Sequence, residues 1–411
     1  MTERVTDDLL SPEAVRDPYA YFGRLREEVP VHYNERYRSW VITRYEHIVE
    51  AFKDPRFSSD RITPFLEQKS EEIERVGMTE TFEVLADWLV FKDPPDHTRL
   101  RRLVHRAFTP RAVQRMQDRV ELLARQLLEE LPVEGEVDLI EDFAYPIPAI
   151  VIAEMLGVPP SDRELFKRWS DDISALVFGG LEDPGRYERA ASGMLELVTY
   201  LNTLIDRYAS EPEDNLISAL VQAQEHGDSL TPAEVVATCT LLLFGGHETT
   251  TNLIGNGLLA LMQHPKQLHY LREHPQDLRG AVEEFLRYDG PAKAVVRAIA
   301  EDVELDGHRL RTGDRVFLVP AAGNRDPRAF REPDRLDVAR DGPQHLGFGL
   351  GMHYCLGAPL ARLEGSLAIG EVLRQFESFE LATDDLSWQP VLLSRGLEKL
   401  PVRFRKMGGA A

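Results

Sequence analysis

One long apolar segment limits what this chain can fold into more than any other feature of its sequence. Residues 230–264 read LTPAEVVATCTLLLFGGHETTTNLIGNGLLALMQH. Thr231 is suited to cap the N-terminus of a helix, and Pro232 is suited to its first position. Because the middle of the segment is apolar nearly all round, we expect this helix to be buried in a protein core. Its longest apolar run is far short of the ~20 residues that span a bilayer.

The flanking segments predict a mainly α protein with small antiparallel β-sheets. VPVHY and SWVITRY lie on either side of a polar turn and predict a hairpin, and Asp306-Gly307 predicts the turn of a second one. Helical patterns dominate from about Pro110 to Arg287, and a further helix is expected after Gly357. The chain lacks the alternating pattern of a doubly wound sheet. Since no linker or internal repeat interrupts it, we expect a single domain over residues 1–411.

The charge of the chain limits the classes of partner. A net charge of -21 argues against nucleic acid, whose phosphates are bound by basic surfaces. The N-terminal segment carries acidic residues where a secretory signal has a basic start and an apolar stretch. Two cysteines, Cys239 and Cys355, cannot form a disulfide framework. We expect a cytoplasmic protein, without membrane insertion and monomeric.

Cys355 lies in the glycine-rich stretch FGLGMHYCLG, Phe348 to Gly357. Glycines let the backbone turn sharply and let a bulky group approach. The cysteine precedes a predicted helix, whose free N–H groups and dipole favour the thiolate. Three chemical roles are open: a nucleophile with a histidine base, a zinc ligand that needs further ligands nearby, or the single axial ligand of a haem iron. Packing as a small apolar residue is equally compatible with the stretch alone.

The spacing Phe348-x-x-Gly351-x-x-x-Cys355-x-Gly357 resembles the haem-binding signature of the cytochrome P-450 superfamily. Further motifs extend the resemblance from about Asp17 to Arg405, and it is to the soluble bacterial type. The resemblance implies a cytochrome P-450 fold, a triangular prism with haem between the central helix and the helix after the cysteine loop. It implies one haem b per chain, with the Cys355 thiolate as axial ligand and Phe348, Gly351 and Gly357 shaping the loop.

The central helix contains GGHETT, Gly245 to Thr250. Glycine inside a helix costs ~1 kcal/mol relative to alanine, so two in succession indicate a close approach. Burial of Glu248 and Thr249 without partners would also be costly. By resemblance, Gly245 and Gly246 lie over the haem, and Glu248 and Thr249 deliver protons to dioxygen, the co-substrate. The alternative is a kink whose hydroxyls bond to the preceding turn. His247 and Cys239 are interpreted as packing residues.

Two sets of charged residues complete the resemblance. Glu284 and Arg287 share a helix face and, with Arg340, are implied to form a buried network that braces the cysteine loop. The second set is implied to bind the haem carboxylates, which suit the fixed fork of arginine donors. Its members are His97, Arg101, Arg297 and His353.

The resemblance implies a haem-thiolate monooxygenase that hydroxylates or epoxidises an apolar small molecule. Electrons are expected from a ferredoxin or flavodoxin with an NAD(P)H-dependent reductase, and Arg102 and Arg106 are hypothesised to bind that donor. The alternatives are a peroxide-driven peroxygenase, a type that generally lacks the acid–alcohol pair, and a non-catalytic haem-binding or sensor protein. The substrate pocket is expected to draw on residues 176–180 and on Leu243, Val295, Val296, Leu392 and Leu393.

Overall fold

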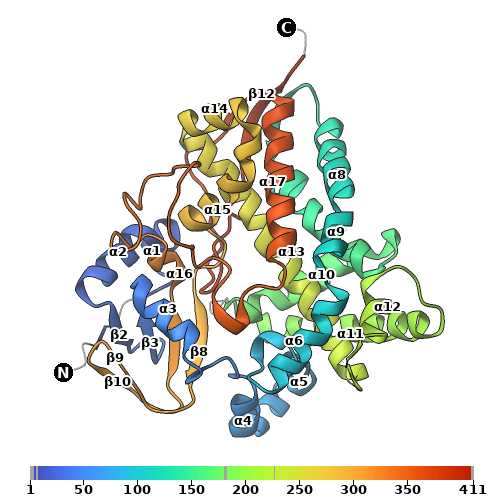
Figure 1. Cartoon of the computed structure of the whole chain (residues 1–411), viewed down its shortest axis with the longest axis vertical. Helices are drawn as coiled ribbons and strands as arrows, with labels where there is room; N and C mark the ends of the chain where they lie inside the picture. Colours follow the sequence, from blue (N-terminus) through green and yellow to red (C-terminus); the bar gives the residue numbers. More distant parts are fainter. Residues whose placement is uncertain (1–3, 6–7, 180–182, 226, 409–411) are drawn as a thin grey trace. The chain divides into compact units, whose positions relative to one another are not determined.

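A computed structural model describes residues 4–5, 8–179, 183–225 and 227–408 of the chain (Figure 1). The described residues form two compact units. Unit 1 comprises Met1–Phe57, Met116–Pro148 and Glu248–Ala411, and unit 2 comprises Ser58–Arg115 and Ala149–His247. Three elements continue from one unit into the other: α9 (Pro146–Leu156), α13 (Pro232–Gln263) and β4 (Phe57–Ser58). Helices dominate and the sheets are small, which confirms the predicted fold class.

Unit 1 contains the six-stranded sheet, the three-stranded sheet, the β9-β10 hairpin and the helices that follow the central helix. Its helices are α1 (Pro12–Arg16), α2 (Pro18–Glu28), α3 (Tyr45–Lys53), α8 (Gln117–Glu130), the π-helical η2 (Ile140–Ala144), α14 (Pro265–Glu273), η4 (Pro275–Asp277), α15 (Leu278–Asp289), α16 (Pro320–Gly323), η5 (Gly351–His353) and α17 (Ala358–Gln375). Its strands are β1 (Arg4–Val5), β2 (Val31–Asn34), β3 (Ser39–Ile42), β5 (Glu134–Asp138), β8 (Val295–Ile299), β9 (Val303–Leu305), β10 (His308–Leu310), β11 (Arg315–Leu318), β12 (Phe376–Leu381) and β13 (Pro401–Lys406).

The largest sheet has six strands in the order β1-β2-β3-β11-β8-β4, and Figure 1 shows the blue β2 and β3 near the orange β8. Strand β11 is parallel to β3 and antiparallel to β8, so Phe317 lies opposite Val41 and Val296. These three side chains join residues of α1 and α2 in one buried cluster. Their neighbours Trp40 and Val316 join residues of α3 in a second cluster. Because successive strand residues face opposite sides, both faces of the sheet are buried.

Both predicted hairpins are confirmed. Strands β2 and β3 pair antiparallel, as do β9 and β10. In the second turn Asp306 and Gly307 have φ of 50° and 76°, the left-handed values that a tight two-residue hairpin turn needs. A three-stranded antiparallel sheet, β12-β13-β5, forms near the end of the chain.

Unit 2 consists mainly of helices. Its elements are α4 (Thr63–Arg75), α5 (Thr79–Ala86), η1 (Leu89–Phe91), α6 (Asp96–Ala107), α7 (Pro110–Arg115), η3 (Pro160–Asp162), α10 (Arg163–Val177), α11 (Arg186–Ser210), α12 (Leu216–Val221), β6 (Gln224–Glu225) and β7 (Asp228–Ser229). Helices α10 and α11 pack through Phe166, Trp169 and Tyr200, whose ring centroids are 5.2–5.4 Å apart. The Trp88 indole donates a hydrogen bond of 2.8 Å to Thr240 of α13, which ties the segment before α6 to the central helix.

Helix α13 begins where the sequence predicts. The Glu234 amide donates to the Thr231 hydroxyl at 3.2 Å, and the Thr231 amide donates to the Glu234 carboxylate at 2.8 Å. This reciprocal pair is a capping box, which satisfies two N–H groups at the helix start. Arg99 of α6 also binds Glu234. In the described part of the chain, no helix combines the length and apolar character needed to cross a membrane.

Candidate active site

The segment around Cys355 is a tight loop that leads into α17. The Cys355 amide donates to the Phe348 carbonyl at 2.9 Å, so the two ends of the loop are joined by a backbone hydrogen bond. Helix α17 starts three residues later with Pro359 in its first turn, as predicted. Cys355 is exposed, whereas Cys239 is fully buried. Cys355 is therefore the cysteine with an accessible sulfur. In addition, burial raises the pKa of the Cys239 thiol to about 12, which disfavours a thiolate at that position.

Glycines permit this loop for specific reasons. Gly349 and Gly351 have φ of 68° and 69°, in the left-handed region that other residues rarely adopt. A Cβ atom at Gly351 would also lie 3.1 Å from the carbonyl oxygen of Phe52 in α3. At Gly357 a Cβ atom would lie 3.9 Å from the Cys355 sulfur. Gly351 is therefore required by the backbone, whereas a Cβ atom at Gly357 would make only an ordinary contact with the sulfur.

A network around Glu283 braces the loop, and the sequence analysis missed it. Glu283 of α15 accepts hydrogen bonds from Arg362 at 2.6 and 2.9 Å and from His345 Nε2 at 3.0 Å. The Arg362 guanidinium lies 4.6 Å from the centroid of the Phe348 ring. Because His345 Nδ1 accepts from the Gly347 amide, Nε2 is the nitrogen that carries the proton.

The surroundings of Glu283 favour the ionised carboxylate over the protonated acid. Burial alone would raise the pKa of this carboxyl group, but the hydrogen bonds from Arg362 and His345 outweigh it and lower the pKa to about 2. Arg362 and His345 lie on opposite sides of Cys355 in the sequence. One ionised carboxylate therefore links the two flanks of the cysteine loop to α15.

The structure brings Glu284, Arg287 and Arg340 together in a second, buried network. Arg287 donates to the two Glu284 oxygens at 2.7 and 2.9 Å, and Arg340 Nε donates to the same carboxylate at 3.1 Å. Arg287 also donates to the Asn324 carbonyl at 2.9 Å, and the Asn324 side chain accepts from the Leu346 amide at 2.7 Å. Through Asn324 this network reaches the first residues of the cysteine loop.

The glycine pair of α13 interrupts an otherwise buried helix. Gly245 is exposed, and a Cβ atom there would meet no heavy atom within 4 Å, although the three residues before it are buried. A Cβ atom at Gly246 would lie 3.2 Å from Ile152 of α9. Open space therefore adjoins Gly245, while Gly246 permits close helix packing. Glu248 and Thr249, three and four residues on, are partly exposed.

Each ring nitrogen of His247 has a neighbour within the helical unit. Its Nδ1 lies 3.0 Å from the Leu243 carbonyl and its Nε2 lies 3.2 Å from the Ser170 hydroxyl of α10. The side chain is buried, and burial lowers its pKa, so the neutral form is favoured. These contacts agree with the interpretation of His247 as a structural residue.

Glu364 is a buried acid that the sequence analysis missed. It lies in α17, is 1% exposed, and burial raises its pKa well above the usual value, with the Thr250 side chain of α13 opposing the shift. The favoured state is therefore the protonated acid. The available signal was an acid beside Leu360, Leu363 and Leu367, the apolar positions of the predicted helix.

Of the four residues predicted to bind haem carboxylates, two lie in unit 2 and two lie in unit 1. In unit 2, His97 of α6 is buried; burial and the nearby Arg101 lower its pKa to about 4. In unit 1, Arg297 is buried in β8, and His353 ends η5 two residues before Cys355. Two guanidinium groups and two imidazoles suit two carboxylates. Within unit 1, the exposed Cys355 thiol and the donors Arg297 and His353 have the chemistry that an iron ligand and carboxylate partners of a haem need.

The residues predicted to line the substrate pocket lie in different clusters and elements of the structure. Val296 and Leu392 are buried in the cluster beneath α1 and α2, and Leu393 packs against it. Val295 packs against the cluster on the opposite face of the sheet, because adjacent strand residues alternate. Leu243 is buried in α13. Of the predicted segment 176–180, Gly180 lies outside the described residues.

Comparisons with known proteins show the family to which the chain is similar. A family model described as "Cytochrome P450" matches residues 200–392. The chain is 43% identical over 401 residues to the vitamin D(3) 25-hydroxylase of Pseudonocardia autotrophica, covering 96% of each protein. It is 39% identical over 399 residues to the polyketide biosynthesis cytochrome P450 PksS of Bacillus subtilis (strain 168), covering 95% of this chain and 96% of that protein.

A solved structure shows the same likeness in three dimensions. The structure of P450BioI in complex with hexadec-9Z-enoic acid ligated acyl carrier protein matches with a TM-score of 0.89 and 35% sequence identity. The match covers 96% of this chain and 99% of that chain. The similarity thus extends over nearly the whole length.

Proposed function

Because the chain belongs to the cytochrome P450 family and is a monooxygenase of that family, we propose that it transfers one oxygen atom of dioxygen to an apolar small molecule. The observation that carries the proposal is the single exposed thiol, Cys355, in a loop braced by Glu283 and, through Asn324, by Glu284. Haem b, when bound by this thiolate, supplies the reductive activation of dioxygen, and a cysteine ligand favours O–O cleavage. The protein supplies orientation and protons.

The cation set has the task of orienting the cofactor. Arg101 and His97 in α6, together with Arg297 and His353, would bind the two haem carboxylates. Neutral His97 can donate one hydrogen bond without adding a second buried charge beside Arg101. Phe348 would pack beside the sulfur under the Arg362 guanidinium, which limits access of water to the thiolate.

Protons would be delivered from α13. Thr249 Oγ1 and the Glu248 carboxyl group are partly exposed four and three residues after Gly245, and one helical turn brings them to the same side as that glycine. Glu364, which burial keeps protonated, is a candidate proton store, since the side chain of Thr250, the residue after Thr249, acts on its carboxyl group. Thr249→Ala should leave haem binding intact but lower the ratio of product formed to NAD(P)H consumed.

The substrate class is proposed from the relatives. Their names include a hydroxylase of vitamin D(3) and an enzyme of polyketide biosynthesis. We assign a substrate of the same kind, a polycyclic or macrocyclic apolar compound. Val295 is a candidate contact in unit 1, since it is only partly buried, whereas Val296 and Leu392 are buried members of a core cluster. A spectral binding screen, read as a shift of the haem Soret band, tests this class.

Electrons would come from a separate acidic protein. Arg102 and Arg106 are exposed on α6, and an exposed basic face on an acidic protein suits a ferredoxin or flavodoxin. Reversal of both charges (R102E/R106E) should slow electron transfer and weaken its salt dependence. The matched control is R403E/R405E, which reverses two exposed arginines of β13. Equal rates in all three proteins would contradict this docking face.

The thiolate ligand has a direct test with an internal control. Reduced protein with carbon monoxide should show a strongly red-shifted Soret band, the mark of a thiolate-bound haem iron. Cys355→Ala should abolish that band, and Cys239→Ala, which changes the buried cysteine, should retain it. A band that survives in Cys355→Ala would refute the assignment. Product formation that needs hydrogen peroxide and ignores NAD(P)H would favour a peroxygenase instead.

A further inference from the structure

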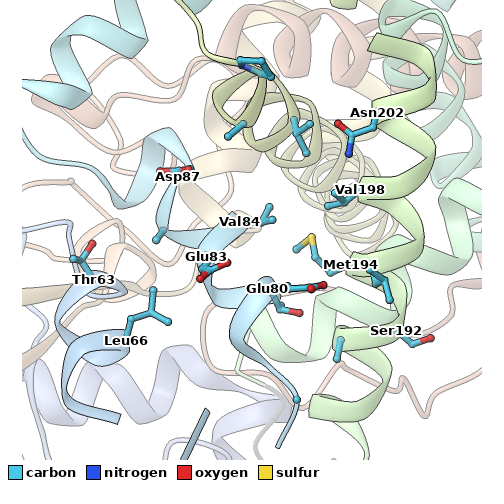
Figure 2. Close-up of a pocket in the computed structure, with 18 of the residues that line it drawn as sticks. Thr63, Leu66, Glu80, Glu83, Val84, Asp87, Ser192, Met194, Val198 and Asn202 are labelled. Atoms are coloured by element: carbon cyan, nitrogen blue, oxygen red, sulfur yellow. The ribbon is translucent and has the colours of Figure 1, made fainter. Parts of the chain in front are cut away.

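A groove of about 490 Å³ lies within unit 1, along the second half of α17. Residues of α8, α14, η4, α15 and α17 line it, and Figure 1 shows α14 and α8 on either side of α17. The lining residues of α17 begin at Ser366, eight residues after Ala358, which is about 12 Å along a helix. The larger cavity of unit 2, about 970 Å³ between α5 and α11, is lined partly by α13 (Figure 2). The described residues that line the groove include none from α13 or the cysteine loop, so the groove is separate from the site assigned above.

The lining of the groove is largely apolar. Leu373 is buried, Leu278 and Leu367 are partly exposed, and Met407 is exposed. Gly370 lets Leu278 of α15 approach α17 closely, since a Cβ atom at this glycine would lie 3.0 Å from the Leu278 side chain. A groove of this volume with leucine walls is suited to a hydrocarbon chain.

The two carboxylates that line the groove already have cationic partners. Glu371 is buried and is paired with Arg374 and, at 3.8 Å, with Arg125 of α8. Glu121 of α8 lies 2.9 Å from Arg125 and 3.8 Å from Arg374. Two guanidinium groups thus balance two carboxylates, and this cluster adds no net charge to the groove.

Arg272 of α14 also lines the groove, and its charge is not balanced in this way. Its guanidinium donates to the main-chain carbonyls of Glu377 at 2.9 Å and Phe376 at 2.6 Å. A guanidinium carries five N–H donors, and the buried Nε of Arg272 has no hydrogen-bond partner. In the described part of the chain, no carboxylate lies within 4 Å of this group. Burial accordingly lowers the pKa of Arg272.

Folding alone explains the hydrogen bonds of Arg272 but not its charge. Main-chain carbonyls accept from neutral donors as well as from charged ones, and desolvation of an unpaired cation costs free energy. A negatively charged ligand would supply the missing counter-charge. The planar fork of a guanidinium suits a carboxylate in particular.

We propose that this groove binds an amphipathic organic anion with a single carboxylate. The hydrocarbon part lies against Leu278, Leu367 and Leu373, and the carboxylate accepts hydrogen bonds from Arg272. This site goes beyond the proposed monooxygenase function, because it requires no contact with the haem. The same chemistry is found in a separate effector and in a substrate that carries a carboxylate, and the spectrum of the haem distinguishes the two.

The test is calorimetric titration of the haem-loaded protein with octanoate, below its micellar concentration, and with 1-octanol and octylammonium as matched probes. Octanoate should bind most tightly and octylammonium most weakly. Arg272→Gln should lose roughly three- to tenfold in affinity for octanoate, the range expected for a partly exposed ion pair. It should bind octanol within about twofold of the native protein, since octanol forms no ion pair. Arg272→Lys, which keeps the charge, should retain the preference for octanoate over octanol.

A second variant tests the groove without removing the hydrogen bonds that Arg272 makes to the main chain. Leu367→Glu changes a partly exposed position of α17 and adds a carboxylate to the groove. It should weaken the binding of octanoate more than that of octanol, because only octanoate is repelled by the new charge. A larger loss for octanol than for octanoate would contradict the proposal.

A control variant separates the groove from general surface charge. Arg279 is an exposed arginine of α15 that does not line the groove, so Arg279→Gln should bind octanoate like the native protein. Equal affinity of the native protein for octanoate and octanol would overturn the proposal. So would an unchanged affinity for octanoate in Arg272→Gln, or an equal loss in Arg279→Gln.

The Soret band is recorded in the same titrations. Binding that depends on Arg272 and leaves the band unchanged identifies a separate effector. An additional binding step that shifts the band and persists in Arg272→Gln identifies an anion that is also a substrate, and both results support the groove assignment. A single step that shifts the band and persists in Arg272→Gln overturns it. Because calorimetry measures binding directly, failure of this proposal leaves the Cys355→Ala result unaffected, and the reverse holds too.

Discussion

Lys293 allows a quantitative prediction about stability and pH. The side chain is 5% exposed, its Nζ donates to the Val391 carbonyl, and its own amide donates to the Leu393 carbonyl at 2.9 Å. Burial, and secondarily the positive charge of Arg395, lowers the pKa of Lys293 from 10.5 to about 7. The folded protein therefore releases the Lys293 proton about 3.5 pH units below the pH at which the unfolded chain does, the difference between 10.5 and about 7.

The sign of the effect follows from proton counts. Between pH 7 and about 10 the unfolded chain retains the Lys293 proton and the folded protein does not, so this residue makes the free energy of unfolding rise with pH. The slope is about 1.4 kcal/mol per pH unit, and the whole effect is roughly 5 kcal/mol. Below pH 7 the lysine is charged in both states, and its cost to stability is constant and largest.

Lys293→Met removes the titrating group and keeps the length of the side chain. At pH 7 the variant should be more stable than the native protein by a few kcal/mol, after a loss of about 1 kcal/mol for the hydrogen bond to Val391. That advantage should shrink by about 1.4 kcal/mol per pH unit as the pH rises. The measurement is the urea unfolding of both haem-loaded proteins at pH 7, 8 and 9, followed by tryptophan fluorescence.

An exposed lysine provides the control for the Lys293→Met variant. Lys399 is exposed, so Lys399→Met should change stability by the same small amount at every pH. A difference between native protein and Lys293→Met that stays constant from pH 7 to 9 would refute the reasoning, because it would mean that Lys293 is charged in the folded protein throughout.

Three further predictions concern the cysteine loop. Glu284→Gln should destabilise the protein by about 3–5 kcal/mol in urea unfolding, because the buried Arg287 and the partly buried Arg340 lose their counter-charge. Gly351→Ala should cost about 1–2 kcal/mol for its left-handed backbone and weaken haem retention, whereas Gly342→Ala, where a Cβ atom meets nothing within 4 Å, should be neutral. The pKa of Glu283 is lowered to about 2, so its contribution is complete above pH 4.5 and is lost as the pH falls towards 2. Glu283→Gln should therefore reduce the loss of urea resistance between pH 5 and 3, and an identical decline in both proteins would contradict this.

Local signals explain which parts of the structure the sequence predicts. The capping residues Thr231 and Pro232, the turn at Asp306-Gly307 and the helix start at Pro359 all act within a few residues, and all are found as expected. The pairing of β3 with β11 was not predicted, because no local pattern links strands so far apart in the chain. The opposite orientation of Val295 and Val296 follows from the same sheet.

In the candidate site, too, the residues of local motifs were predicted, whereas residues defined by tertiary contacts were missed. The motifs around Cys355 and Gly245 are contiguous in sequence, and the resemblance named their residues directly. Glu283 and Glu364 were missed, since one is distinguished by partners at positions 345 and 362 and the other by burial against α13. Their roles depend on tertiary contacts that spacing along the chain does not encode. The chemical roles of Glu248, Thr249 and the cation set stay predictions until the variants are measured.

The mixed sheet has a consequence for the synthesis of the protein. Strand β3 is completed early, but its neighbour β11 and the Asp314 carboxylate that accepts from the Trp40 indole come 274 residues later. At 5–20 residues per second, the ribosome needs roughly 15 to 55 s to supply them. During that time the apolar faces of the first hairpin have no sheet to join, so nascent chains should depend on chaperones over this interval. A truncated chain that ends before Arg315 should aggregate for the same reason.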